Sequence, residues 1–152
     1  MSATSSSSIT MASCGRGRAG ALAGPVRADA TGGSQGFAQL VCLIGDFTDT
    51  DPTPAMLDSL VKVLAWLANR YGIDTSPGAS TSFVSRGSQR WPVGTSVTTH
   101  TIAGHRDMSY TECPGDHVYF LINSDLRERV QTQRAAWQGA LFRAQRLGPV
   151  VS

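Results

Sequence analysis

The segment GHRDMSYTECPG occupies residues 104–115 and places a histidine and a cysteine eight positions apart. Arg-Asp follows His105, and Pro-Gly follows Cys113. Imidazole and thiolate both suit zinc, which in catalytic sites takes three protein ligands and leaves a fourth position for water. Spacing alone is weak evidence for a metal site and favours a core histidine and a buried thiol, so the case for a metal depends on the surrounding residues.

The clearest predicted element around this segment is a helix over TPAMLDSLVKVLAWLANRYG, residues 53–72. Thr53 can cap it, Pro54 suits its first position, and Gly72 can end it. Its apolar residues recur at three- and four-residue steps, which makes one apolar stripe and predicts a helix that packs on a sheet. They are Leu57, Leu60, Val61, Leu64, Leu67 and Tyr71.

Strands are predicted from short apolar or β-branched runs. AQLVCLIG, 38–45, predicts a strand covered on both faces, with Cys42 as a small buried hydrophobe. Two further β-like pieces, 81–84 and 96–102, flank a turn-rich stretch.

Two helices are predicted after the segment. DHVYFLI, 116–122, has Asp116 as a possible cap, and 124–147 has Ser124. The second helix carries a basic set diluted by acidic neighbours, which favours a solvated helix face over a nucleic-acid site. Its arginines are Arg127, Arg129, Arg134, Arg143 and Arg146.

Composition limits the class of protein and the kinds of partner that the chain can have. The chain has 152 residues, 41% hydrophobic and 16% charged, with a net charge of +2. These values indicate a globular domain, and the small charge argues against nucleic acid as a partner. No apolar run approaches the roughly 18 residues of a membrane span. The three cysteines contain no C-x-x-C, so a disulfide framework or a thioredoxin-type site is not expected.

The residues around the His–Cys pair resemble a known signature. GHRDMSYTECPGDHVY, 104–119, is similar to that of the peptidoglycan recognition protein and type 2 N-acetylmuramoyl-L-alanine amidase family. The family pattern is G-H-R-D, a short spacer, then T-x-C-P-G. LIGDFTDTDPTPAMLDSLVKVLAW, 43–66, resembles the family's strand, turn and following helix, and 85–95 resembles a loop of bacterial members. The resemblance covers about residues 16–133.

This resemblance implies an α/β fold, with a mixed central sheet flanked by helices, and a zinc-dependent activity. Family members cut the amide between the lactyl group of N-acetylmuramic acid and L-alanine. His105 and Cys113 match two of the three zinc ligands. Thr111 matches a position that polarises the scissile carbonyl, and here it offers a hydroxyl where some members have lysine.

Other side chains near the expected metal site are candidates for supporting it or for contacting substrate. Asp107 and Arg106 are expected to orient a ligand or to be structural. Trp91, in a loop, is the best candidate for substrate contact, although a structural role is the commoner one. Trp66 and Trp137 are expected to pack on helices.

The chain departs from the family upstream. The family's other zinc histidine and a catalytic tyrosine lie on and after an early strand, yet no histidine precedes His100 and no tyrosine precedes Tyr71. We therefore expect the C-terminal part of an amidase domain, lacking the first strands. The predicted organisation is a disordered leader at 1–15, a partial domain at 16–133, and a helical extension and tail at 134–152.

Substitutes for the third ligand are few. His100 in a strand would point to the face opposite the signature histidine, and His117 is expected to face away from the site. Cys14 is chemically suitable but lies in the leader. Asp29 and Asp46 are expected to be ordinary turn carboxylates.

The leading expectation is a zinc amidase-like domain acting on peptidoglycan or a muropeptide, truncated or degenerate, and its activity is left open. The alternatives are a non-catalytic peptidoglycan-binding module and an inactive gene remnant. The resemblance implies an extracellular or cell-envelope location in a bacterium. The start MSATSSSSITMASCGRGRAG lacks a positive n-region and an apolar h-region, so no signal peptide is predicted. Oligomeric state is not predicted.

Overall fold

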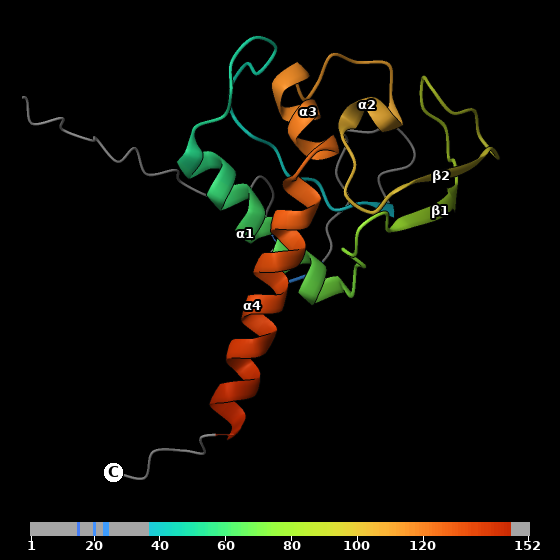
Figure 1. Ribbon diagram of the computed structural model, residues 1–152. Helices are drawn as coiled ribbons and strands as arrows, with labels where there is room; N and C mark the ends of the chain where they lie inside the picture. Colours follow the sequence, from blue (N-terminus) through green and yellow to red (C-terminus); the bar gives the residue numbers. More distant parts are fainter. Residues whose placement is uncertain (1–14, 16–19, 21–22, 25–36, 147–152) are drawn as a thin grey trace, which may run out of the picture.

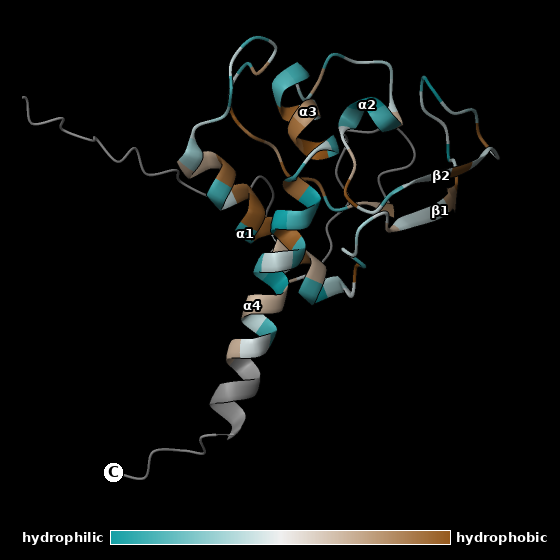
Figure 2. Ribbon diagram, viewed as in Figure 1, coloured by the Kyte–Doolittle hydropathy of each residue, from teal (hydrophilic) through white to brown (hydrophobic). Residues whose placement is uncertain are grey.

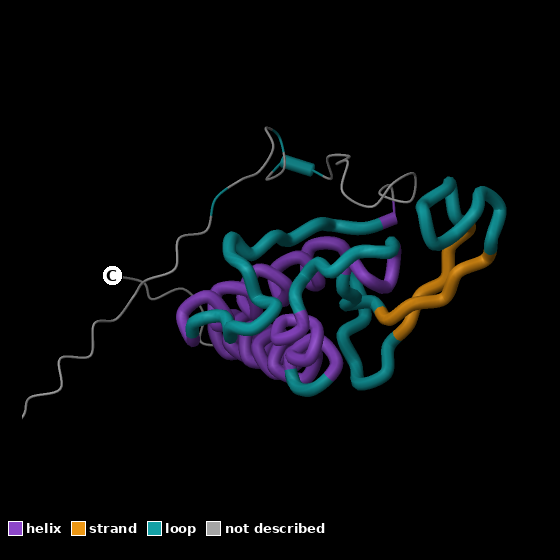
Figure 3. Tube along the Cα trace, turned by 90° about the horizontal axis from the view of Figure 1, so that it is seen from above, coloured by secondary structure: helices purple, strands orange, loops and turns teal. Residues whose placement is uncertain are grey.

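The computed structural model describes residues 15, 20, 23, 24 and 37–146, and side chains up to 140. Its elements in chain order are α1 (Pro54–Tyr71), β1 (Ser80–Val84), β2 (Ser96–His100), α2 (His105–Met108), α3 (Asp116–Asn123) and α4 (Leu126–Arg146). The long helices lie together, and the β1–β2 hairpin stands at the opposite end of the domain (Figures 1 and 3). Within this described part, no helix has both the length and the apolar character that crossing a bilayer requires.

The bounds of helix α1 confirm the prediction over 53–72, but in the described residues it packs against α4 and not on a sheet as predicted. The Thr53 hydroxyl accepts a hydrogen bond from the Met56 N–H at 3.2 Å, and Pro54 is the first helical residue. Gly72 ends the helix in the left-handed region at φ 64°, where its N–H donates to the carbonyl of Ala68. Local signals therefore set both ends of this helix.

The two β-like pieces form the antiparallel hairpin β1–β2. Its register runs from Ser80 opposite His100 to Val84 opposite Ser96. The predicted α/β class is confirmed, but the sheet in the described residues has only these two strands. The larger mixed sheet, and the absence of its first strands, stay predictions.

The predicted strand at 38–45 is wrong for this structure. The run is irregular, Ile44 is 92% exposed, and Cys42, expected to be buried, is exposed. A strand needs a neighbour to which its N–H and C=O groups can bond. Across the described residues, no backbone hydrogen bond joins this run to β1 or β2.

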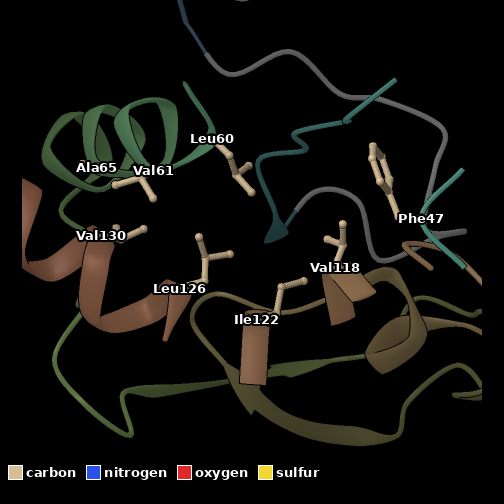
Figure 4. Close-up of a cluster of buried hydrophobic side chains, with 8 residues drawn as sticks. All are labelled: Phe47, Leu60, Val61, Ala65, Val118, Ile122, Leu126 and Val130. Carbon is tan, nitrogen blue, oxygen red and sulfur yellow. The ribbon is translucent and has the colours of Figure 1, made fainter. Parts of the chain in front are cut away.

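The core lies where α1, α3 and α4 meet, as Figure 4 shows. Its buried side chains form one hydrophobic cluster, which consists of Phe47, Leu60, Val61, Ala65, Val118, Ile122, Leu126 and Val130. Hydropathy follows this arrangement, because apolar residues run along α1 and α3 whereas α2 is hydrophilic (Figure 2). Helix α2 therefore offers only Met108 as an apolar side chain with which to dock.

Two predicted caps are corrected. Asp116 is the first residue of α3, and Gly115 holds the cap position. Ser124 does not begin the long helix: its N–H and its hydroxyl both donate to the Leu121 carbonyl at 3.3 Å, which closes α3. Helix α4 therefore starts later than predicted.

The arginines of α4 bind within the chain. Arg127 donates to the Ile102 carbonyl at 3.0 Å, and Arg129 pairs with Asp125 at 2.6 Å. Arg134 donates to the Ile73 carbonyl at 2.6 Å. The sequence favoured a solvated face, but Arg127 and Arg134 are only partly exposed and bind backbone carbonyls of other segments. The side chains of Arg143 and Arg146 lie outside the described residues.

Gly115 docks the signature segment onto the rest of the domain. It adopts φ 86°, and a Cβ there would lie 2.4 Å from the backbone carbon of Phe47. The neighbouring His117 N–H donates to the Phe47 carbonyl at 3.1 Å. Because Phe47 is only 8% exposed within the core cluster, this contact ties the site to the core.

We predict that Gly115→Ala destabilises the protein by about 2 kcal/mol more than Gly78→Ala. Both glycines have positive φ, 86° and 79°, so both variants bear the cost of a left-handed alanine. Only Gly115→Ala adds a clash, since no atom lies within 4 Å of a Cβ at Gly78. Urea unfolding would measure the difference, and equal losses would contradict the close approach.

Candidate functional site

His105 is the first residue of α2, a helix of four residues. Gly104 precedes it, and its N–H donates to the Asp107 carboxylate at 2.8 Å. The Ser109 N–H donates back to the His105 carbonyl at 3.0 Å. A Cβ at Gly104 would lie 2.9 Å from the Tyr119 ring, so this ring packs directly against the backbone before the histidine.

Asp107 joins α2 to α3. Its second oxygen accepts a hydrogen bond from the Tyr119 hydroxyl at 2.8 Å, while the first holds Gly104. The hydrogen bond to Asp107 raises the pKa of the Tyr119 hydroxyl, and burial adds to the effect. The carboxylate therefore binds the backbone before His105 and the tyrosine of α3. Its supporting role toward a ligand stays a prediction.

Arg106 spans the signature loop. Its Nε and Nη2 donate to the Glu112 carbonyl at 3.0 and 2.5 Å, and its Nη1 pairs with Asp116 at 2.6 Å. The guanidinium also lies over the Tyr119 ring, 5.1 Å from its centroid. Charge-assisted hydrogen bonds are the stronger kind, so Arg106 fixes the residue before Cys113 relative to α2.

Cys113 is exposed at the far end of this loop. Partial burial and the nearby Cys42 raise the pKa of the Cys113 thiol, and Arg106 offsets part of that effect. The Cys113 N–H donates to the Thr111 hydroxyl oxygen at 3.2 Å. This bond uses the oxygen as an acceptor and leaves the hydroxyl proton of Thr111 free to donate. The proximity of Cys42 was missed, because the sequence favoured a buried strand there.

The donor types fit zinc, but their number falls short. His105 supplies an imidazole and Cys113 a thiol, the ligands that zinc prefers. Among the residues that the structure describes, however, no three His, Cys, Asp or Glu side chains lie close enough to hold a metal ion. The described part of the chain does not by itself form a three-ligand centre.

Of the residues considered above as a third zinc ligand, those that the structure describes either make another contact or are exposed. His117, in α3, has its Nδ1 2.7 Å from an Asp51 carboxylate oxygen, and His100 lies exposed at the end of β2. Asp46 accepts the Thr48 N–H at 3.0 Å, a bond that lowers the pKa of its carboxyl, as suits a turn carboxylate. Cys14 and Asp29 lie outside the described residues.

The three tryptophans lie on different elements. The indole N–H of Trp91 donates to the Asp107 carbonyl at 3.2 Å, so this side chain contacts the signature segment directly. Trp66 is 37% exposed on α1, and Trp137 packs against the core cluster. Substrate contact by Trp91 stays a prediction.

Comparison with known proteins gives one match. The family model described as N-acetylmuramoyl-L-alanine amidase matches residues 8–116, more than two thirds of the chain. This span contains His105, Thr111 and Cys113. No curated protein and no solved structure matches the chain.

We predict that Tyr119→Phe lowers the free energy of unfolding by about 1 kcal/mol at pH 7, because the bond to Asp107 is lost. The folded protein raises the pKa of Tyr119 above its unfolded value of about 10. The bond's contribution is therefore present below pH 10 and is lost as pH rises through the folded pKa. Denaturant titrations at pH 7 and above pH 10 would measure this.

Tyr110→Phe is the matched control, since Tyr110 is 72% exposed. This variant should unfold like the wild type at both pH values. A Tyr119→Phe deficit that did not shrink at high pH would contradict the assigned bond.

Proposed function

The chain belongs to the N-acetylmuramoyl-L-alanine amidase family, and we propose from this premise that it acts on peptidoglycan. The bond concerned is the amide between the lactyl group of N-acetylmuramic acid and L-alanine of the stem peptide. Such a substrate implies an extracellular or cell-envelope site of action. The proposed domain covers residues 16–133.

The observation that carries the proposal is the bracing of the signature loop by Arg106. Two of its nitrogens hold the Glu112 carbonyl, next to Cys113, while its own backbone follows His105. This bracing supports a common role for the imidazole and the thiol. We assign them as two zinc ligands of the proposed site.

We assign Thr111 as a hydrogen-bond donor to the substrate. Its oxygen accepts the Cys113 N–H, so its proton can be donated to an acceptor beside the thiol. The scissile carbonyl is such an acceptor. A hydroxyl supplies a neutral hydrogen bond here, which stabilises a developing oxyanion less than a charged donor does.

A second candidate function is peptidoglycan binding without hydrolysis. The observation that favours it is the ligand count, because the described residues bring together fewer than three metal donors. Two ligands hold zinc less firmly than three. A binding module would keep the same braced segment and use it for recognition alone.

Zinc content separates the two candidates first. We predict near-stoichiometric zinc in protein purified and dialysed without chelator, and a loss of that zinc in Cys113→Ala. Cys42→Ala is the matched control, since it removes another exposed cysteine and should retain the metal. Zinc in the wild type no higher than in Cys113→Ala would contradict the assignment of Cys113 as a ligand.

Turnover is the second measurement. An amidase should release free stem peptide from purified peptidoglycan, and a chelator should stop the release. Co-sedimentation with peptidoglycan without any release would favour the binding module. If the protein neither released stem peptide nor co-sedimented with peptidoglycan, the result would contradict action on peptidoglycan.

A further inference from the structure

Helix α2 cannot be stable through its own backbone. Four residues form less than two turns, whereas isolated helices shorter than about 12 residues are marginal in water. Three of its four residues are hydrophilic and Met108 is its single apolar side chain, so it has little apolar surface to bury (Figure 2). The orientation of His105 must therefore come from side-chain contacts, both those of Arg106 and Asp107 within α2 and those made by neighbouring elements.

The carbonyls of this region show where those side chains come from. The Gly104 carbonyl accepts the Asp107 N–H at 3.1 Å, and the His105 carbonyl accepts the Ser109 N–H. The next two carbonyls lie at the helix end, where no helical N–H can reach them. The Arg106 carbonyl accepts from Arg90, and the Asp107 carbonyl accepts from the Trp91 indole.

The loop that carries these two donors is itself fixed. It connects β1 to β2, and Ser85, only 2% exposed, donates its hydroxyl to the Trp91 carbonyl at 2.9 Å. The Ser88 hydroxyl accepts the N–H of Trp91 at 2.9 Å. The Arg90 guanidinium lies over the Trp91 ring at 5.2 Å, so the two donors are held as a pair.

We infer that Arg90 and Trp91 are positioning residues that orient His105 by binding the Arg106 and Asp107 carbonyls of α2. They act from the hairpin side, opposite the Asp107–Tyr119 bond on the α3 side. The functional meaning of this orientation rests on the role proposed above for His105. The mechanical coupling stands on the hydrogen bonds alone, and it can be tested without metal or substrate.

The test is NMR of the metal-free protein, using the imidazole resonances and the exchange of the Ser109 amide. Trp91→Phe keeps an aromatic ring and removes the N–H. We expect it to shift or broaden the His105 resonance and to speed Ser109 exchange about three- to tenfold, as for loss of one hydrogen bond. His100 and His117 serve as internal references and should not move.

Trp66→Phe is the matched control. Trp66 also has an arginine over its ring, Arg70 at 5.4 Å, but it lies exposed on α1, away from the signature segment in sequence. Replacement of an indole that stacks with an arginine is thus common to both variants. Trp66→Phe should leave His105 and Ser109 unchanged.

Arg90→Met tests the same inference with a second variant, in case Trp91→Phe does not fold. Arg90→Met keeps the aliphatic stem, removes the donor to the Arg106 carbonyl, and should move the same two signals. Superimposable His105 resonances and unchanged Ser109 exchange in these folded variants would overturn the inference. Equal effects of Trp66→Phe would also overturn it.

Titration with a metal ion distinguishes failure of the positioning role of Arg90 and Trp91 from failure of the proposed zinc site. If the wild type takes up Co²⁺, Trp91→Phe should bind it more weakly and alter its absorption spectrum, whereas Trp66→Phe should not. Failure of the wild type to bind any metal would count against the zinc assignment alone. The NMR result would still decide whether Arg90 and Trp91 orient His105.

Discussion

The double hydrogen bond from Arg106 to the Glu112 carbonyl is the contact on which the site depends. It begins one residue after His105 and ends one residue before Cys113, so it closes the loop between them. Ordering a backbone residue costs about 1–2 kcal/mol, and a loop of this length would not hold one shape without such a cross-link. The guanidinium is suited to this because several donors act from one planar group, with the Tyr119 ring beneath it.

Two glycines let this braced segment contact the domain. Gly104 admits the Tyr119 ring and Gly115 admits the Phe47 backbone, at separations that leave no room for a Cβ. Phe47 belongs to the core cluster with Val118 of α3, so the segment is joined through backbone contacts to the most buried part of the protein. The polar site thus gains rigidity from the core without burying its own side chains.

The sequence predicts what local signals determine. Thr53 and Gly72 bound α1 as expected, and the β-branched pieces paired as a hairpin. The run at 38–45 failed because a strand depends on a neighbour distant in sequence, which an apolar run cannot specify. The motif identified His105 and Cys113 as candidates. It could not show that Arg106 and Trp91 donate to backbone carbonyls, because a carbonyl as an acceptor leaves no mark on the sequence.

The contacts that hold the signature segment use side chains other than the proposed ligands. Arg106, Asp107, Arg90 and Trp91 supply the donors and acceptors, and none of them needs a bound ion to do so. In small zinc domains, by contrast, metal binding provides the folding free energy. The contacts that shape this segment are thus made between protein groups. An amidase and a binding module could share this scaffold, and the difference between them lies in ligand number rather than in fold.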